Sequence, residues 1–189
     1  MKNVLITGAS GYIGKHITLQ LLNQGYGVRA SVRNLAKSAE VRDAVRPHLL
    51  GSSNLDSRLT FVELDLEKDS GWDVARQGID VLMHTASPFP LASPKDENDL
   101  IRPAVDGTLR ALKAAKSSGV KRVILTSSMA AIYGRELSAG VSEYDETMWT
   151  DVTHPVGRGA YTKSKTLAEK AAWDYIKSDA PELELTTIN

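Results

Sequence analysis

The sequence contains no cysteine among its 189 residues, which excludes disulfide bonds, thiolate catalysis and cysteine-ligated metals. Its four histidines (His16, His48, His84 and His154) lie far apart along the chain, so their spacing does not favour a zinc or iron site and we expect no metal. An excess of charge is also missing, because 23 basic residues balance 23 acidic ones. This balance gives no indication of a nucleic-acid or anionic-membrane partner.

Long apolar runs are missing too, and no stretch approaches the roughly 20 residues of a membrane span. The chain enters a strand-like run at residue 4, which leaves no room for a signal peptide, so we expect a cytoplasmic protein. An apolar content of 42% and a charged content of 24% are ordinary for a globular protein, and the chain has no internal repeat. We therefore expect one domain over residues 1–189.

Short apolar runs alternate with helical patterns along the chain, which is typical of α/β folds. We expect strands at residues 4–6, 28–32, 59–64, 81–85, 123–126 and 183–188. We expect helices at residues 13–22, 36–50, 72–76, 97–118 and 161–175. Pro47 disturbs the second helical pattern, and Pro103 either kinks the fourth helix or marks its true start. Loops are expected at 51–54 and 88–94, and the long segment 129–158 favours a functional loop.

The glycine-rich segment Thr7–Gly14 joins the first strand to the first helix. Glycines allow a tight turn and a close approach of backbone to a ligand, while a helix N-terminus offers free N–H groups and a positive dipole end. This order favours a dinucleotide phosphate site, with a ligand-free turn as the alternative. A P-loop is excluded, because Ala9 stands where that motif needs glycine and His16 where it needs a hydroxyl. The predicted binding residues are Gly8, Ser10, Gly11, Tyr12, Ile13 and Gly14.

The residue just past the second strand distinguishes the two dinucleotides, because an acid there binds the 2′-hydroxyl of NAD and an arginine suits the 2′-phosphate of NADP. Here it is Arg33, with Lys37 one helical turn on and no acidic residue before Glu40. A guanidinium matches a phosphate bidentately. We therefore expect Arg33 and Lys37 to bind NADP(H) in preference to NAD(H), which remains possible. The alternative is an ordinary solvated basic helix start.

Polar and small residues follow the third and fourth strands. Asp65 either hydrogen-bonds the adenine amino group or caps the next helix. The fourth strand ends in three small residues at a carboxyl end, where open α/β sheets bind ligands, and the segment 88–94 is placed to cover the cofactor. His84 is expected to pack or hydrogen-bond locally rather than to catalyse. The further predicted cofactor-binding residues are Asp65, Leu66, Thr85, Ala86 and Ser87.

A second chemical signal lies at the start of the last helical pattern. Tyr161 and Lys165 are four residues apart and therefore share one helix face. An isolated pair of this kind is more often an ordinary helix surface. Together with the glycine loop and with Ser127 and Ser128 at the end of the fifth strand, the pair favours an active site.

These motifs together resemble the extended short-chain dehydrogenase/reductase family. The matching pieces are Thr7-Gly8-x-x-Gly11-x-x-Gly14, Asp65, Thr126-Ser127-Ser128 and Tyr161-x-x-x-Lys165. Three stretches, residues 28–33, 85–88 and 161–169, are similar to the branch of dihydroflavonol reductases, cinnamoyl-CoA reductases and related aldehyde or ketone reductases. The resemblance covers essentially the whole chain.

The resemblance implies a Rossmann-type doubly wound parallel sheet, with strand order 3-2-1-4-5-6 and helices on both faces. It implies the reduction of a small-molecule aldehyde or ketone (dihydroflavonol-like) with NADPH, and Tyr161 as the general acid. Lys165 would stabilise the phenolate and bind the nicotinamide ribose, and Ser128 would donate a hydrogen bond to the carbonyl oxygen. The helices that start near Glu97 and Tyr161 form the family's usual dimer surface, so a homodimer is possible.

The chain departs from the family pattern in two places. Ala104 stands where many extended members carry asparagine, which bears more on sugar-nucleotide epimerases than on reductases. Family members also continue past the sixth strand into a region that builds the substrate pocket, and this chain ends where that region begins. Two alternative functions stay open: a nucleotide-sugar epimerase or dehydratase with bound NAD, and a dinucleotide-binding fragment without chemistry.

Overall fold

The computed structural model describes residues 1–50, 54–89 and 94–189 of the chain. Six strands form one sheet in the order β3-β2-β1-β4-β5-β6, and every neighbouring pair is parallel. The predicted α/β fold and strand order are thereby confirmed. The strands are β1 (Asn3–Thr7), β2 (Gly27–Val32), β3 (Leu59–Glu63), β4 (Val81–His84), β5 (Arg122–Thr126) and β6 (Glu184–Ile188).

Helices connect these strands, because parallel neighbours need a crossover. The α-helices are α1 (Tyr12–Asn23), α2 (Ser38–Val45), α3 (Leu55–Arg58), α4 (Trp72–Ala75), α5 (Asn98–Ser118) and α6 (Ala160–Ser178). The described part of the chain also contains three short 3₁₀ helices, η1 (Leu35–Lys37), η2 (Arg46–His48) and η3 (Met129–Ala131). Shortly after helix α1, Gly25 adopts the left-handed conformation that commonly terminates a helix. The N–H of Gly25 donates to the carbonyl of Leu22, and the N–H of Tyr26 donates to the carbonyl of Leu21.

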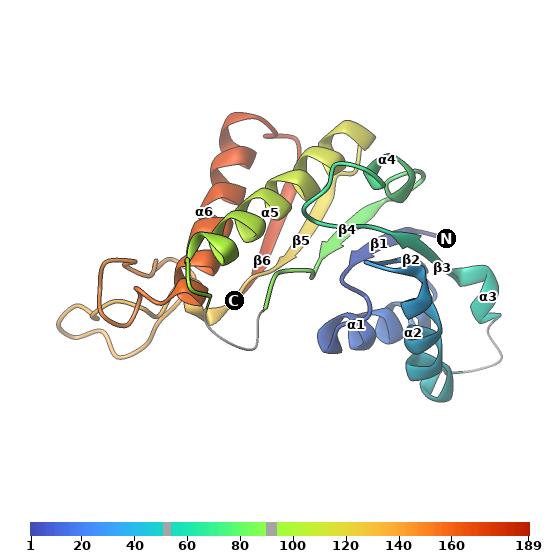
Figure 1. Ribbon diagram of the computed structural model, residues 1–189, viewed down its shortest axis with the longest axis horizontal. Coiled ribbons are helices and arrows are strands. Elements are labelled where there is room, and N and C mark those ends of the chain that lie inside the picture. The colour runs from blue at the N-terminus through green and yellow to red at the C-terminus, as the bar shows by residue number, and fades with distance from the viewer. Residues whose placement is uncertain (51–53, 90–93) are drawn as a thin grey trace.

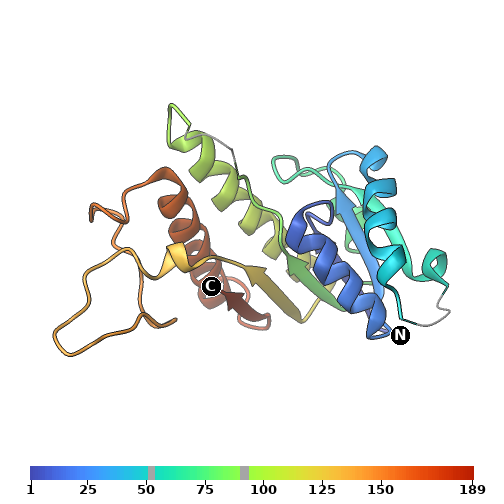
Figure 2. The same ribbon diagram turned by 90° about the horizontal axis from the view of Figure 1, so that it is seen from below.

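The helices lie in two layers, with α1 and α2 on one face of the sheet and α4, α5 and α6 on the other (Figures 1 and 2). Each face has its own apolar core. Leu5 and Leu82 pack against Leu112 of α5 and Ala172 of α6. On the opposite face, the core is formed by strand residues together with residues of α1 and α2, among them Ile6, Val28, Leu22 and Val45. The alternation of neighbouring residues between two cores explains why the strand runs are continuously apolar.

The end of the sheet at β6 is less well covered. Among the residues that the structure describes, strand β6 pairs only with β5, and Ile188 is 55% exposed. Figure 2 shows β5 and β6 with no helix in front of them, whereas α1 lies in front of the first strands. Within the described ranges, every helix is too short or too polar to cross a bilayer.

The local differences from the sequence expectations have physical causes. The pattern over 36–50 is divided into η1, α2 and η2, and α2 ends at Val45 because Pro47 lacks the N–H that an α-helix would need there. Pro103 is the sixth residue of α5 and does not mark its start. Helix α3 was not expected, since a single turn is too short to show a periodicity. Of the expected loops, residues 51–53 and 90–93 lie outside the described residues.

Candidate functional site

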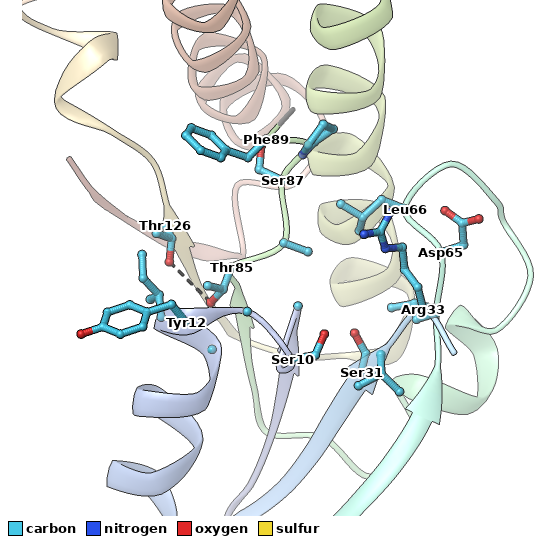
Figure 3. A pocket seen from close by; sticks show the side chains of 18 of the residues that line it. Ser10, Tyr12, Ser31, Arg33, Asp65, Leu66, Thr85, Ser87, Phe89 and Thr126 are labelled. Carbon is cyan, nitrogen blue, oxygen red and sulfur yellow. Dashed lines mark hydrogen bonds between the residues drawn. The ribbon is translucent and has the colours of Figure 1, made fainter. Parts of the chain in front are cut away.

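A cavity of about 1080 Å³ opens at the carboxyl ends of the parallel strands. It lies where the strand order reverses between β1 and β4, which is the usual ligand crevice of an open α/β sheet. Figure 3 shows side chains from both sides of this reversal pointing into one space. All the sequence-predicted site residues except Ser128 line it: Gly8, Ser10, Gly11, Tyr12, Ile13, Gly14, Arg33, Lys37, Asp65, Leu66, Thr85, Ala86, Ser87, Tyr161 and Lys165.

The glycine loop is so tightly packed that two of its glycines leave no space for a side chain. Gly8 has a φ of +70°, and a Cβ there would lie 2.9 Å from the Cα of Ala86. A Cβ on Gly14 would lie 2.3 Å from the carbonyl oxygen of Gly8. The first glycine therefore allows the turn to pass close to the end of β4, and the second allows α1 to pack against the loop.

Helix α1 directs its N-terminus at the cavity. Gly11 is its N-cap residue, no side chain caps it, and its first turn contains no acidic residue. The first N–H groups of a helix have no acceptor within the helix, and this end carries partial positive charge. Tyr12, Ile13 and Gly14 line the cavity at this point. An anion such as a pyrophosphate therefore fits this end of the helix.

Buried Thr7 ties the glycine loop to the segment after β4. Its Oγ1 accepts hydrogen bonds from the N–H groups of Thr85 (3.0 Å) and Ala86 (3.1 Å), and it lies 2.9 Å from Nδ1 of His84. A hydroxyl has one donor and two acceptor positions, so the O–H of Thr7 donates to Nδ1. The network therefore assigns the proton of the neutral His84 to Nε2.

Burial holds His84 in this neutral form. The side chain is 2% exposed, and this burial, together with the positive charge of Lys165, lowers the pKa of His84 to about 4. A neutral imidazole that accepts from Thr7 has a structural part next to Thr85 and Ala86, which line the cavity. This confirms the expectation that His84 hydrogen-bonds locally.

Basic residues gather at the end of β2. Arg33 and Lys37 both line the cavity, and the close-up view shows Arg33 reaching toward Leu66 (Figure 3). Glu40 lies between Lys15 (2.5 Å) and Lys37 (3.1 Å), and hydrogen bonds from Lys15 first and then from Lys37 lower the pKa of Glu40. None of the ion pairs in the described part of the chain includes Arg33. Arg33 is therefore the guanidinium available to an anion here.

Asp65 closes a turn next to this basic group. Its Oδ1 accepts from the N–H of Glu67, and its Oδ2 lies 3.3 Å from Lys68. The backbone hydrogen bond first, then Lys68 and the more distant charge of Arg33, lower the pKa of Asp65. The next helix begins only at Trp72 and has Gly71 as its N-cap residue, so the helix-capping alternative is wrong. The contact between Asp65 and adenine stays a prediction.

Tyr161 and Lys165 face the other end of the cavity from the first turns of α6. The Nζ of Lys165 lies 5.8 Å from the centre of the Tyr161 ring, and the ring of Phe89 stands edge-on to it at 5.4 Å. Burial lowers the pKa of Lys165, and no ion pair within the described residues includes it. An ion pair of 2.7 Å between Lys163 and Glu97 holds this part of α6 to the start of α5.

The two serines after β5 have different surroundings. Ser127 lines the cavity, and its hydroxyl donates to the carboxylate of Glu169. Ser128 is not among the lining residues, and its Oγ accepts from the N–H of Ala130 at 3.2 Å. The proton of Ser127 is therefore already donated. Ser128 is the N-cap residue of η3 and uses only its oxygen there, so its hydroxyl proton is not used in that bond. The role of Ser128 in catalysis stays a prediction.

Several lining residues were not assigned to the site from the sequence. Glu40 stands three residues after Lys37, a spacing that predicts an ion pair on a helix. The fold brings the others to the cavity, although the motif Thr126-Ser127-Ser128 and the segment 88–94 had pointed to some of them: Ser31, Val32, Leu64, Glu67, Pro88, Phe89, Pro94, Asp99, Leu100, Thr126 and Ser127. In the described part of the chain, histidine and carboxylate side chains form no group of three that would hold a metal.

Comparison with known proteins relates this chain to one family. Residues 4–187 match the model of the NAD dependent epimerase/dehydratase family. Dihydroflavonol 4-reductase of Arabidopsis thaliana is 38% identical over 179 residues, which cover 92% of this chain and 45% of the plant protein. The ketoreductase azaE of Aspergillus niger is 37% identical over 197 residues, which cover 100% of this chain and 56% of the fungal protein. The chain thus spans about half the length of these curated relatives.

Solved structures show the same relationship. Yeast methylglyoxal/isovaleraldehyde reductase Gre2, complexed with NADPH, superposes with a TM-score of 0.81 at 30% identity, over 99% of this chain and 57% of that chain. Gre2 of Candida albicans in complex with NADPH superposes with a TM-score of 0.83 at 32% identity, over 100% of this chain and 57% of that chain. Both proteins share the fold that surrounds the cavity described above.

Proposed function

The chain belongs to the NAD dependent epimerase/dehydratase family, and from this premise we propose that it binds NADPH and reduces a small-molecule aldehyde or ketone. The observation that carries the proposal is a single cavity that contains the glycine loop, Arg33, and the pair Tyr161 and Lys165. The names of the relatives support the same class of reaction, since they include a dihydroflavonol 4-reductase, a ketoreductase and an isovaleraldehyde reductase.

The residues at one end of the cavity fit NADPH. The uncapped N-terminus of α1 and the side-chain-free Gly8 and Gly14 form a place for the pyrophosphate. Arg33, outside every ion pair of the described residues, suits the 2′-phosphate bidentately. Lys37 would add a second cation once the phosphate competes with Glu40 for it. Asp65 and Leu66 would lie beside the adenine.

The residues at the other end fit proton delivery to a carbonyl oxygen. NADPH, when bound, supplies the hydride. Tyr161 would donate the proton, and the ammonium of Lys165 would stabilise the phenolate that remains and bind the ribose hydroxyls. Ser128 would donate a hydrogen bond to the carbonyl oxygen as negative charge develops on it. Phe89, edge-on to Tyr161, would border the substrate and limit the access of water.

The epimerase or dehydratase alternative is less well supported. Such enzymes hold NAD, and a carboxylate would be expected at the position of Arg33. The acid nearest to this position in the sequence is Glu40, which is paired with Lys15 and Lys37. A non-catalytic dinucleotide-binding function would not need Tyr161 and Lys165 in the same cavity. Dimerisation through α5 and α6 stays a prediction.

A panel of aldehydes and ketones assayed with NADPH and with NADH on the full-length gene product tests the proposal. We expect turnover of at least one carbonyl with NADPH, and weaker turnover with NADH. Tightly bound NAD in the purified protein, together with no carbonyl reduction, would contradict the proposal and support the epimerase alternative.

A further inference from the structure

Glu169 is a buried acidic residue of α6 for which the proposed chemistry has no use. Its side chain is 4% exposed. It follows Lys165 by four residues and Tyr161 by eight, so the three residues lie along one side of α6. None of the ion pairs among the described residues includes Glu169. A carboxylate that is buried without a cation needs hydrogen-bond donors instead.

Three donors converge on this carboxylate. Oε2 accepts from the hydroxyl of Ser127 and from Nδ2 of Asn189 at 2.7 Å, and Oε1 accepts from Nε1 of Trp173 at 3.4 Å. A carboxylate offers acceptors only, and it therefore matches a set of partners that all donate. Asn189 also donates to the carbonyl oxygen of Ser128 at 3.3 Å. The carboxylate thus connects α6 to the Ser127 hydroxyl after β5 and, through Asn189 after β6, to the carbonyl of Ser128.

This arrangement gives the two adjacent serines different roles. Ser127 lines the cavity together with Tyr161 and Lys165, so by position alone it would compete to donate to a bound carbonyl. Its proton is engaged by Glu169, however, whereas the hydroxyl of Ser128 only accepts from the N–H of Ala130. A second, very small cavity is lined by Ser127, Lys165 and Glu169, which places the carboxylate directly behind the proposed chemistry.

We propose that Glu169 is a positioning residue, which withdraws the Ser127 hydroxyl from catalysis and fixes the two serines at a set distance from Tyr161 and Lys165. The inference rests on the proposed reductase function. Glutamine at position 169 would keep the size of the side chain, but it has no charge and only one acceptor oxygen, so its NH₂ group must face at least one of the three donors. The charge-assisted bonds from Ser127 and Asn189 would then weaken, which would release the Ser127 hydroxyl and let the backbone segment of Ser128 shift with Asn189.

The expected consequence is a lower turnover with an unchanged affinity for NADPH. Displacement of a catalytic donor by a fraction of an ångström to an ångström lowers turnover by about ten- to a hundredfold. We expect this decrease in kcat for Glu169→Gln at temperatures well below its unfolding midpoint. The Kd for NADPH should change by less than about twofold, because the pyrophosphate and 2′-phosphate contacts lie at the other end of the cavity.

The test compares Glu169→Gln, Ser127→Ala, the double variant of these two, and Ser128→Ala in the full-length gene product. The measurements are kcat, KM, the Kd for NADPH and the unfolding midpoint. Glu182→Gln, at an exposed position, is the matched control. Ser127→Ala should lower kcat only a fewfold, and the double variant should be no slower than Glu169→Gln, because both changes act on one contact. If Glu169→Gln does not fold, Asn189→Ala removes one donor and keeps the carboxylate.

The outcomes separate this inference from the proposed function. A wild-type protein that binds NADPH but reduces no carbonyl contradicts the proposed function, and this inference with it. Wild-type turnover with an unchanged kcat in Glu169→Gln contradicts the role of Glu169 alone. A loss of turnover in Ser127→Ala as large as that in Ser128→Ala would show that Ser127 is the donor and would overturn the assignment of roles.

Discussion

The two ends of the cavity are built differently. At the glycine-loop end, free N–H groups of α1 and cations at the surface, such as Arg33 and Lys37, form the site. At the opposite end, buried and half-buried groups come from several elements and hold one another, as Glu169 and Ser127 do. The first end is suited to binding by charge, and the second to precise placement of a proton donor. Changes at the first end should therefore alter cofactor affinity, and changes at the second should alter turnover.

The largest effect is expected at the second end, from Tyr161→Phe. Removing the phenolic proton should lower carbonyl reduction by about 10²- to 10⁴-fold, the range for loss of a general acid. NADPH affinity, measured by fluorescence titration, should remain within about twofold, since the phosphate contacts are untouched. Tyr175→Phe, on the same helix, is the control. If carbonyl reduction persists in Tyr161→Phe, Tyr161 is not the general acid and the assignment of turnover to this end of the cavity is wrong.

The second prediction concerns His84, at the boundary between the two ends. Its pKa is lowered in the folded protein from the ordinary 6.5 to about 4, so the unfolded chain binds more protons between these values. The free energy of unfolding should therefore have its full value above pH 6.5. As the pH drops to about 4, it should fall by roughly 3 kcal/mol in total. His84→Asn, whose Oδ1 still accepts from Thr7, should flatten this dependence in urea unfolding measured across the pH range.

His48→Gln, which replaces an exposed histidine, is the control for this measurement. It should keep the loss of stability seen in the wild type. An equally steep loss in His84→Asn would show that another group is responsible.

The third prediction tests the charged end through Arg33→Ala. Charge-assisted hydrogen bonds are worth about 1.5–3 kcal/mol, so NADPH should bind roughly ten- to a hundredfold more weakly. The Kd for NADH should hardly change, because NADH has no 2′-phosphate. Isothermal titration with both cofactors measures the difference, with Arg102→Ala, an exposed change on α5, as the control. Equal losses for both cofactors would mean that Arg33 does not recognise the 2′-phosphate.

The smallest effect is expected from Glu40→Gln, which should strengthen NADPH binding where Arg33→Ala weakens it. Glu40 holds Lys37 and Lys15, so its neutralisation should free both cations and tighten NADPH binding. Exposed ion pairs are weak, and we expect only about a two- to fivefold decrease in Kd at low salt, which should fade at high salt. Glu67→Gln, another lining acid, is the control. Weaker NADPH binding in Glu40→Gln would contradict the competition for Lys37.

The same contrast explains what could be predicted from the sequence. The positions of the strands and the glycine-loop end follow from contiguous patterns, such as the apolar run 4–6 and the turn that carries Gly8 and Gly14, whereas the strand order was implied by the family resemblance. Helix α3 was not predictable, because a helix of four residues is too short to show a hydrophobic periodicity. Nor was the path of the chain after Asp65, where a closed turn stands in place of a helix cap.

At the second end, the interactions depend on contacts between distant segments. Two adjacent serines look alike in the sequence, and only the packing of α6 against the end of β5 brings Glu169 to Ser127. The bonds from Thr7 to the segment after β4 likewise join residues almost eighty positions apart. No local pattern contains such information, because it arises from the tertiary fold.

The most direct test of the division between the two ends is a crystal structure of the full-length gene product with NADP⁺. We predict the pyrophosphate at the N-terminus of α1, the 2′-phosphate within hydrogen-bond distance of Arg33, and the nicotinamide ribose beside Lys165. A dinucleotide bound outside this cavity, or a 2′-phosphate that does not contact Arg33, would contradict the account.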